Sequence, residues 1–195
     1  VPGLVMFTLM LSSPLLTALG IVREKETGSI YNIYSSTVTR FEFLAGKLVP
    51  YVLISWVNAV ILWVMATLWF GVPFKGNLLF FLAASLVFVL SSTGIGLLVS
   101  LLVRTQIAAL LITMIVSILP TILYSGLLVP VSSLSPGSQI QAHLFPGMYY
   151  TNIVRGVFLK GVGPEVLWVD VLALAAYAAI LRIVGYWLFT KRPQS

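Results

Sequence analysis

The sequence predicts an all-α membrane protein, a bundle of helices that crosses the bilayer several times, and three observations lead to this fold class. Of the 195 residues, 59% are hydrophobic and 8% are charged, and the mean hydropathy is +1.07. Soluble domains carry about 25% charged residues. The 11 basic and 5 acidic side chains lie mostly in short clusters between long apolar runs. In lipid such runs form helices, because a helix pairs its own backbone polar groups.

Five apolar runs are long enough to cross a hydrocarbon core about 30 Å thick, which takes about 20 helical residues. The predicted spans are residues 1–22, 48–72, 78–103, 107–129 and 167–189. The fifth span holds Asp170 near its start and Arg182 about two turns from its end, where an arginine can snorkel to the headgroups. We therefore expect no ionisable side chain deep in a span, which disfavours an ion-coupled carrier or channel.

Residues 105–154 carry no formal charge and are too long for a single crossing. Prolines and glycines interrupt this stretch, so we expect the fourth span to end near residue 129 and a polar turn to follow. Residues 140–158 should form a partly inserted outer hairpin, because broken helices survive in a membrane only when they pack in protein. The residues assigned to this re-entrant helical hairpin are Pro130, Pro146, Tyr149 and Arg155.

The basic residues predict the orientation of the bundle, because cytoplasmic connections are rich in Lys and Arg. With the first span running inward, seven basic residues lie inside and three outside. The inner set is Arg23, Lys25, Arg40, Lys47, Arg104, Lys191 and Arg192, and the outer set is Lys75, Arg155 and Lys160.

The longest inner connection, residues 23–47, follows the first span. After a break at Gly28, the apolar side chains Ile30, Ile33 and Tyr34 would share one face of a helix. We expect a short amphipathic helix on the inner surface, either as a protein-docking element or as an interfacial helix that anchors the loop in lipid.

Small and polar side chains recur at helical spacing within the spans. Ser92, Gly96 and Ser100 form a pattern that lets helices pack closely, within the protomer or at a subunit interface. Ser55 and Asn58 share a face of the second span, and Thr113 and Ser117 share one of the fourth. Such groups line a path or form interhelical hydrogen bonds.

The sequence has few residues that could form a catalytic, metal or nucleotide site. It has no cysteine and one histidine, so we expect neither a catalytic residue nor a metal site. The segment around Gly46 and Lys47 lacks the hydroxyl residue and the first glycine of a phosphate loop, so no nucleotide site is expected. The basic residues form no stripe, which argues against nucleic acid as a partner.

Seven blocks of this sequence resemble, in order, those of type-2 ABC transporter permeases, specifically their multidrug-resistance-like export subunits. The blocks are Val1-Pro2-Gly3, Arg23-Glu24-Lys25-Glu26-Thr27-Gly28-Ser29, Gly46-Lys47-Leu48-Val49-Pro50-Tyr51, Phe70-Gly71-Val72-Pro73-Phe74-Lys75-Gly76, Gly94-Ile95-Gly96-Leu97-Leu98-Val99-Ser100, Ser125-Gly126-Leu127-Leu128-Val129-Pro130 and Arg155-Gly156-Val157-Phe158-Leu159-Lys160-Gly161.

The resemblance implies a single permease domain over residues 1–195, equivalent to the second to sixth spans, with the first span and an outer domain missing. It implies a dimer, as a homodimer or a heterodimer, in the cell membrane, which would be a bacterial inner membrane. A separate cytoplasmic ATPase subunit would hold ATP and Mg²⁺, so this chain would bind no cofactor. The ATPase would dock on the inner connection. The residues assigned to that coupling are Arg23, Glu24, Glu26, Gly28, Tyr31 and Arg40.

The function expected from the sequence is export of drugs or other amphiphiles. A membrane anchor or assembly subunit of a larger complex is the alternative, and an ion-coupled carrier or channel is less favoured. The acidic pair Glu24 and Glu26 favours a protein partner at the inner connection, because a lipid anchor would present basic residues to anionic headgroups.

Overall fold

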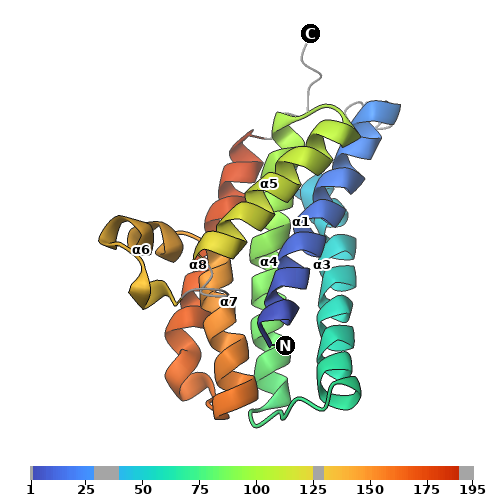
Figure 1. The fold of residues 1–195 in the computed structure, drawn as a ribbon. Helices are drawn as coiled ribbons and strands as arrows, with labels where there is room; N and C mark the ends of the chain where they lie inside the picture. Colours follow the sequence, from blue (N-terminus) through green and yellow to red (C-terminus); the bar gives the residue numbers. More distant parts are fainter. Residues whose placement is uncertain (1, 29–39, 125–129, 189–195) are drawn as a thin grey trace.

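The computed structural model describes residues 2–28, 40–124 and 130–188, and five long helices within these ranges form one bundle (Figure 1). They are α1 (Pro2–Thr27), α3 (Arg40–Val64), α4 (Leu78–Leu102), α5 (Gln106–Tyr124) and α8 (Pro164–Leu188). Each contains a segment long and apolar enough to cross a membrane. The prediction of an all-α bundle with five spans is therefore confirmed.

The helices run further than the predicted spans at the charged end of the bundle. The first span was expected to end at residue 22 and the second to begin at residue 48, whereas α1 continues to Thr27 and α3 begins at Arg40. Hydropathy marks the part of a helix that lies in lipid and not where its backbone hydrogen bonds stop. Residues 29–39, which include Tyr31 and most of the expected amphipathic helix, lie outside the described residues.

α4 is the central helix, and α1, α3, α7 and α8 all pack against it. Every residue from 91 to 97 is buried, and most of these side chains are small. A side chain at Gly94 would meet Leu181 of α8, with its Cβ 2.9 Å from the leucine Cβ. Small residues thus let neighbouring helices approach α4 from more than one side.

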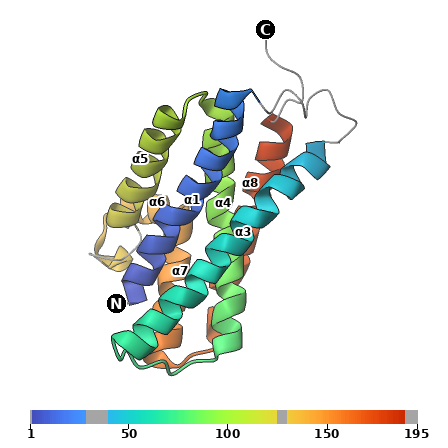
Figure 2. The same ribbon diagram turned by 90° about the vertical axis from the view of Figure 1, so that its right-hand side faces the viewer.

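α3 and α5 lie on opposite sides of α1 (Figures 1 and 2). α1, α4 and α8 finish where α3 and α5 begin, and we call this end the basic end, after Arg23, Lys25, Lys47 and Arg104. At the opposite end α3 passes into a π-helical turn, η1 (Met65–Trp69), and a loop leads back to α4.

Aromatic rings fill the opposite end of the bundle. Phe74, in the loop before α4, meets Trp63, Phe81 and Phe158 edge to face at ring centroid distances of 5.6, 5.9 and 5.0 Å. Phe81 and Phe158 are fully buried. These contacts join α3, α4 and the segment before α8, so they fix both loops at this end.

The predicted helical hairpin is present as two short helices, α6 (Pro136–His143) and α7 (Pro146–Arg155). Phe145 is the residue before α7 and Pro146 occupies its first turn, where a proline costs no hydrogen bond. α6 projects from the side of the bundle, whereas α7 packs against α1, α4 and α8 (Figure 1). A π-helical turn, η3 (Gly156–Lys160), then leads to α8.

Candidate functional site

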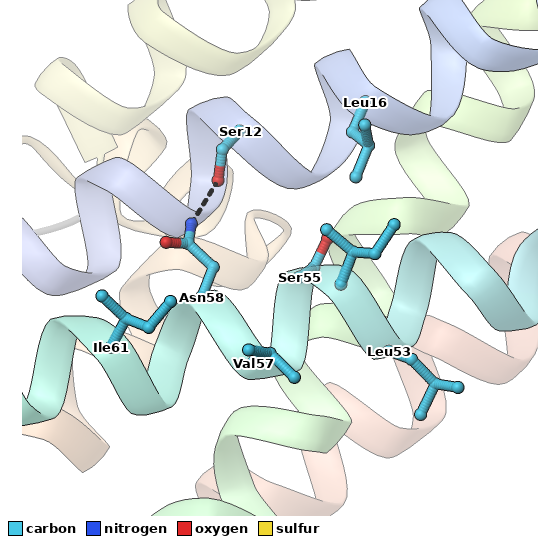
Figure 3. A pocket seen from close by; sticks show the side chains of 8 residues that line it. Ser12, Leu16, Leu53, Ser55, Val57, Asn58 and Ile61 are labelled. Atoms are coloured by element: carbon cyan, nitrogen blue, oxygen red, sulfur yellow. Dashed lines mark hydrogen bonds between the residues drawn. The ribbon is translucent and has the colours of Figure 1, made fainter.

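A groove between α1 and α3, near the middle of both helices, is the first candidate site (Figure 3). Its volume of about 660 Å³ lies within the usual range for sites that hold drug-sized molecules. The lining is mostly aliphatic, with three polar side chains. The residues that line it are Ser12, Leu16, Leu53, Ile54, Ser55, Val57, Asn58 and Ile61.

One interhelical hydrogen bond crosses this groove. The Asn58 amide Nδ2 donates to the Ser12 hydroxyl Oγ at 3.2 Å (Figure 3). The sequence left Asn58 and Ser55 open as path-lining or hydrogen-bonding residues; in the structure Asn58 forms an interhelical hydrogen bond, and both residues line this groove. Ser12 was not singled out, because nothing in an apolar run shows which serine faces another helix.

A second pocket lies on the same side of α1, nearer the basic end, with a volume of about 680 Å³. Leu16 lines both pockets, so they are successive sections along α1. Tyr51 of α3 lies directly over Gly20, where any larger residue would overlap its ring. The lining of this second pocket is half polar: Leu16, Leu19, Gly20, Arg23, Glu24, Thr27, Tyr51 and Gln106.

The two pockets follow one another along α1 and differ in polarity. Charged and amide groups line the pocket nearer the basic end, whereas aliphatic side chains and the Ser12–Asn58 pair line the groove near the middle of α1 and α3. Such a gradient suits a molecule that has a polar head and an apolar body.

Polar contacts at the basic end tie the last turn of α1 to three other helices. Lys47 of α3 forms an ion pair with Glu24, and Lys25 donates to the backbone carbonyl of Ser100 in α4. Gln106 of α5 donates to the Glu26 carboxylate at 2.6 Å. The expected coupling carboxylates therefore have partners within the chain.

Of the other residues assigned to coupling, Arg23 and Gly28 adjoin this cluster at the end of α1, and Tyr31 lies outside the described ranges. Arg23 is exposed in the last turns of α1. Gly28 follows α1 with a φ of 79°, a left-handed conformation that ends the helix and that glycine adopts without strain. Arg40 is the first residue of α3.

Ser92, Gly96 and Ser100 lie inside the protomer, which is one of the two locations that their spacing allowed. All three are buried. A Cβ at Gly96 would be 2.5 Å from the Pro14 carbonyl oxygen, so this position packs directly on the backbone of α1. The pattern thus serves the contact between α1 and α4.

The hairpin residues take different positions. Pro130 is exposed, Pro146 is buried at the start of α7, and Arg155 is half-buried at its end. The Tyr149 hydroxyl donates to the His143 carbonyl at 2.5 Å and closes α6 against α7. Burial raises the pKa of Tyr149, and the nearby negative charge of Asp170 raises it further by a smaller amount.

Tyr150 is the largest fully buried side chain of the hairpin, and sequence reasoning missed it. Its ring stacks on Phe88 with centroids 4.1 Å apart, and its hydroxyl lies 2.7 Å from the Ser85 hydroxyl. Tyr149 and Tyr150 are adjacent in an apolar segment, and only the rotation of α7 decides which of them faces α4.

The expectation that Arg182 snorkels to the headgroups at the basic end is wrong. Its guanidinium Nη2 donates to the Leu90 carbonyl at 3.1 Å and to the Thr93 hydroxyl at 3.2 Å. Leu90 is the midpoint of α4. Because helical side chains lean toward the amino end of their helix, Arg182 points back into the bundle. An ionisable group thus reaches the middle of the helical bundle.

No three histidine, aspartate or glutamate side chains converge within residues 2–28, 40–124 and 130–188. The features that stand out in these residues are five apolar spans, a hairpin whose second helix, α7, packs among them, and a groove between α1 and α3. Together they define a multi-pass integral membrane protein.

Residues 1–187 match the family described as ABC-2 family transporter protein, and the chain belongs to this family. It is 33% identical over 192 residues to the probable multidrug ABC transporter permease YbhS of Escherichia coli, covering 98% of this chain and 51% of that protein. Identity to the probable multidrug ABC transporter permease YbhR of the same organism is 28%, over 98% of this chain and 52% of YbhR.

ABC transporter G family member 20 of Dictyostelium discoideum is 28% identical over 198 residues, which cover the whole of this chain and 27% of that protein. The chain spans about half the length of the two bacterial relatives. No solved structure matches it.

Proposed function

We propose that the chain is the membrane-spanning permease part of an ATP-binding cassette exporter that moves drugs or other amphiphiles across the membrane. Membership of the ABC-2 family and the names of the bacterial relatives support this proposal. The two neighbouring pockets along α1 carry it, because the more polar one suits the head of an amphiphile and the apolar groove suits its body.

The chain works with partners that supply the energy. A separate cytoplasmic ATPase subunit holds ATP and Mg²⁺ and docks at the basic end, and a second permease subunit completes the transporter. The basic end faces the cytoplasm, in keeping with the positive-inside rule, and the membrane is a bacterial inner membrane.

Coupling passes through the last turn of α1. The contacts of Glu24, Lys25 and Glu26 reach α3, α4 and α5. A displacement of this turn by the ATPase therefore acts on several helices at once, without a flexible linker between them.

The groove is tested by transport through the complete permease and its ATPase in proteoliposomes. Asn58→Leu removes the amide at nearly constant size, and Asn58→Gln keeps an amide as the matched control. We expect the leucine variant to slow ATP-driven efflux of fluorescent amphiphiles about tenfold, because it leaves the Ser12 hydroxyl without its partner, and the glutamine variant to keep most of the activity. Equal efflux by both variants would mean that the groove is not part of the transport path.

Coupling needs a second measurement. Glu24→Gln together with Glu26→Gln should lower ATP-driven efflux or release the ATPase, while membrane insertion is unchanged. If the wild-type complex binds the ATPase but moves no amphiphile, the chain is an anchor or assembly subunit. If the double variant keeps full efflux and full ATPase retention, these carboxylates have no coupling role.

A further inference from the structure

A second groove lies on the other side of α3, between α3 and α8 and above α4, with a volume of about 580 Å³. It extends from the middle of α4 to the basic end, where Tyr186 and Trp187 lie exposed at its mouth. The lining is aliphatic and aromatic apart from one charged side chain, that of Arg182. The residues that line it are Ala45, Leu48, Val49, Val52, Leu53, Leu90, Leu97, Arg182, Ile183, Tyr186 and Trp187.

Arg182 brings a positive charge into this groove without a counter-charge from the described parts of the chain. Its two hydrogen-bond acceptors there, the Leu90 carbonyl and the Thr93 hydroxyl, are both uncharged. Asp170 precedes Arg182 by twelve residues in α8, which is about 18 Å along the helix axis. A charged arginine in an apolar, membrane-facing surface is costly, so such residues have an anionic or polar partner.

An anion would bind the guanidinium more strongly than its two neutral acceptors on α4 do. Arginine carries five N–H groups in a planar fork, and both contacts to α4 are made by Nη2. The fork matches the paired oxygens of a phosphate or carboxylate, which it binds with two parallel hydrogen bonds.

The surroundings select the kind of anion. Val49, Leu53 and Ile183 are exposed along the groove and offer an apolar trough to an acyl chain. Trp187 lies five residues beyond Arg182, about 8 Å along the helix, and exposed tryptophan is typical of the headgroup region. In the structure the Arg182 side chain points into the bundle, and a change of rotamer would turn it along α8 toward the headgroups.

We propose that this groove binds an acidic phospholipid of the leaflet at the basic end, with an acyl chain along the trough and its phosphate held by Arg182. On binding, the guanidinium exchanges its two neutral acceptors on α4 for an anionic one. The site goes beyond the proposed transport function, because lipid binding here requires neither ATP nor an exported substrate.

Trp187 reports on the occupant by its fluorescence. The complete permease is reconstituted in vesicles of brominated phosphatidylglycerol or brominated phosphatidylcholine, mixed with unbrominated lipid, and quenching gives the relative affinity of the two lipids. Because the chain has five tryptophans, the signal of Trp187 is the difference between the wild-type protein and Trp187→Phe. We expect phosphatidylglycerol to be preferred about fivefold, the contribution of one basic residue near a membrane surface.

Three variants locate the preference. Arg182→Gln should abolish it, and Arg182→Lys, which keeps the charge but loses the fork, should retain a part. Arg104→Gln removes one positive charge from the same end, outside the groove, and should leave the preference unchanged. If the glutamine variant does not fold, the lysine variant still tests the site, since a preference equal to that of the wild type would contradict the role of the fork.

Other outcomes overturn the proposal. Equal quenching by the two lipids in the wild-type protein would mean that the groove is an ordinary apolar surface. A preference that survives Arg182→Gln would place the acidic lipid elsewhere. Absence of quenching by either lipid would mean that a protein, such as a second permease subunit, covers the groove.

Discussion

The contact between α1 and α4 at Gly96 allows a quantitative prediction. In Gly96→Ala the new Cβ would lie 2.5 Å from the Pro14 carbonyl oxygen and 2.9 Å from the Thr17 Cβ. Carbon–oxygen contacts normally begin at about 3.3 Å, so α1 must retreat by nearly 1 Å. Overpacking of this kind lowers the free energy of unfolding by about 1–3 kcal/mol, and the higher helix propensity of alanine offsets up to about 1 kcal/mol of this loss. We expect a net loss of about 1–2 kcal/mol.

The free energy of unfolding of the permease in detergent micelles, measured by SDS titration with circular dichroism, checks this value. Gly46→Ala is the matched control, because a Cβ at Gly46 meets nothing within 4 Å. That variant should be as stable as the wild type or up to about 1 kcal/mol more stable. A Gly96→Ala protein as stable as Gly46→Ala would refute the close packing of α1 on α4.

Three further predictions concern other contacts. In a double-mutant cycle with Glu24→Gln and Lys47→Gln, unfolding free energies should reveal a coupling of about 0.5–1 kcal/mol; additive effects would contradict the ion pair. Tyr150→Phe should cost about 1 kcal/mol in the same titration because its 2.7 Å hydrogen bond to α4 is lost, and an unchanged midpoint would argue against that contact. A cysteine introduced at Ser135 should react with an impermeant thiol reagent in intact cells and one at Ser36 should not, and the reverse labelling would invert the orientation.

The number of spans could be predicted because lipid imposes it directly. About 20 apolar residues are needed for each crossing, and each of the five runs contains a spanning helix. The hairpin could be predicted for a related reason, since Pro146 and the polar residues nearby prevent a full crossing. The helix ends could not be predicted, because α1 continues through charged residues to Thr27 and α3 already begins at Arg40, so the backbone stays helical beyond the apolar runs.

The candidate sites depend on helix rotation and register, which the sequence does not specify. Asn58 was placed on a face, but its partner Ser12 became known only when α1 lay against α3. The sequence position of Arg182 predicts how far along α8 the residue lies. The direction of its side chain depends on hydrogen-bond acceptors that α4 supplies.

The position of α3 has a mechanical consequence. A groove lies on each of its flanks, one toward α1 and one toward α8, and Leu53 lines both. A tilt of α3 between its neighbours, against the well-packed α4 behind it, would therefore act on both grooves. A tilt that narrows one groove widens the other, so a molecule bound in one groove would disfavour binding in the other. Spin-label distances from α3 to α1 and from α3 to α8 would then change in opposite directions during transport.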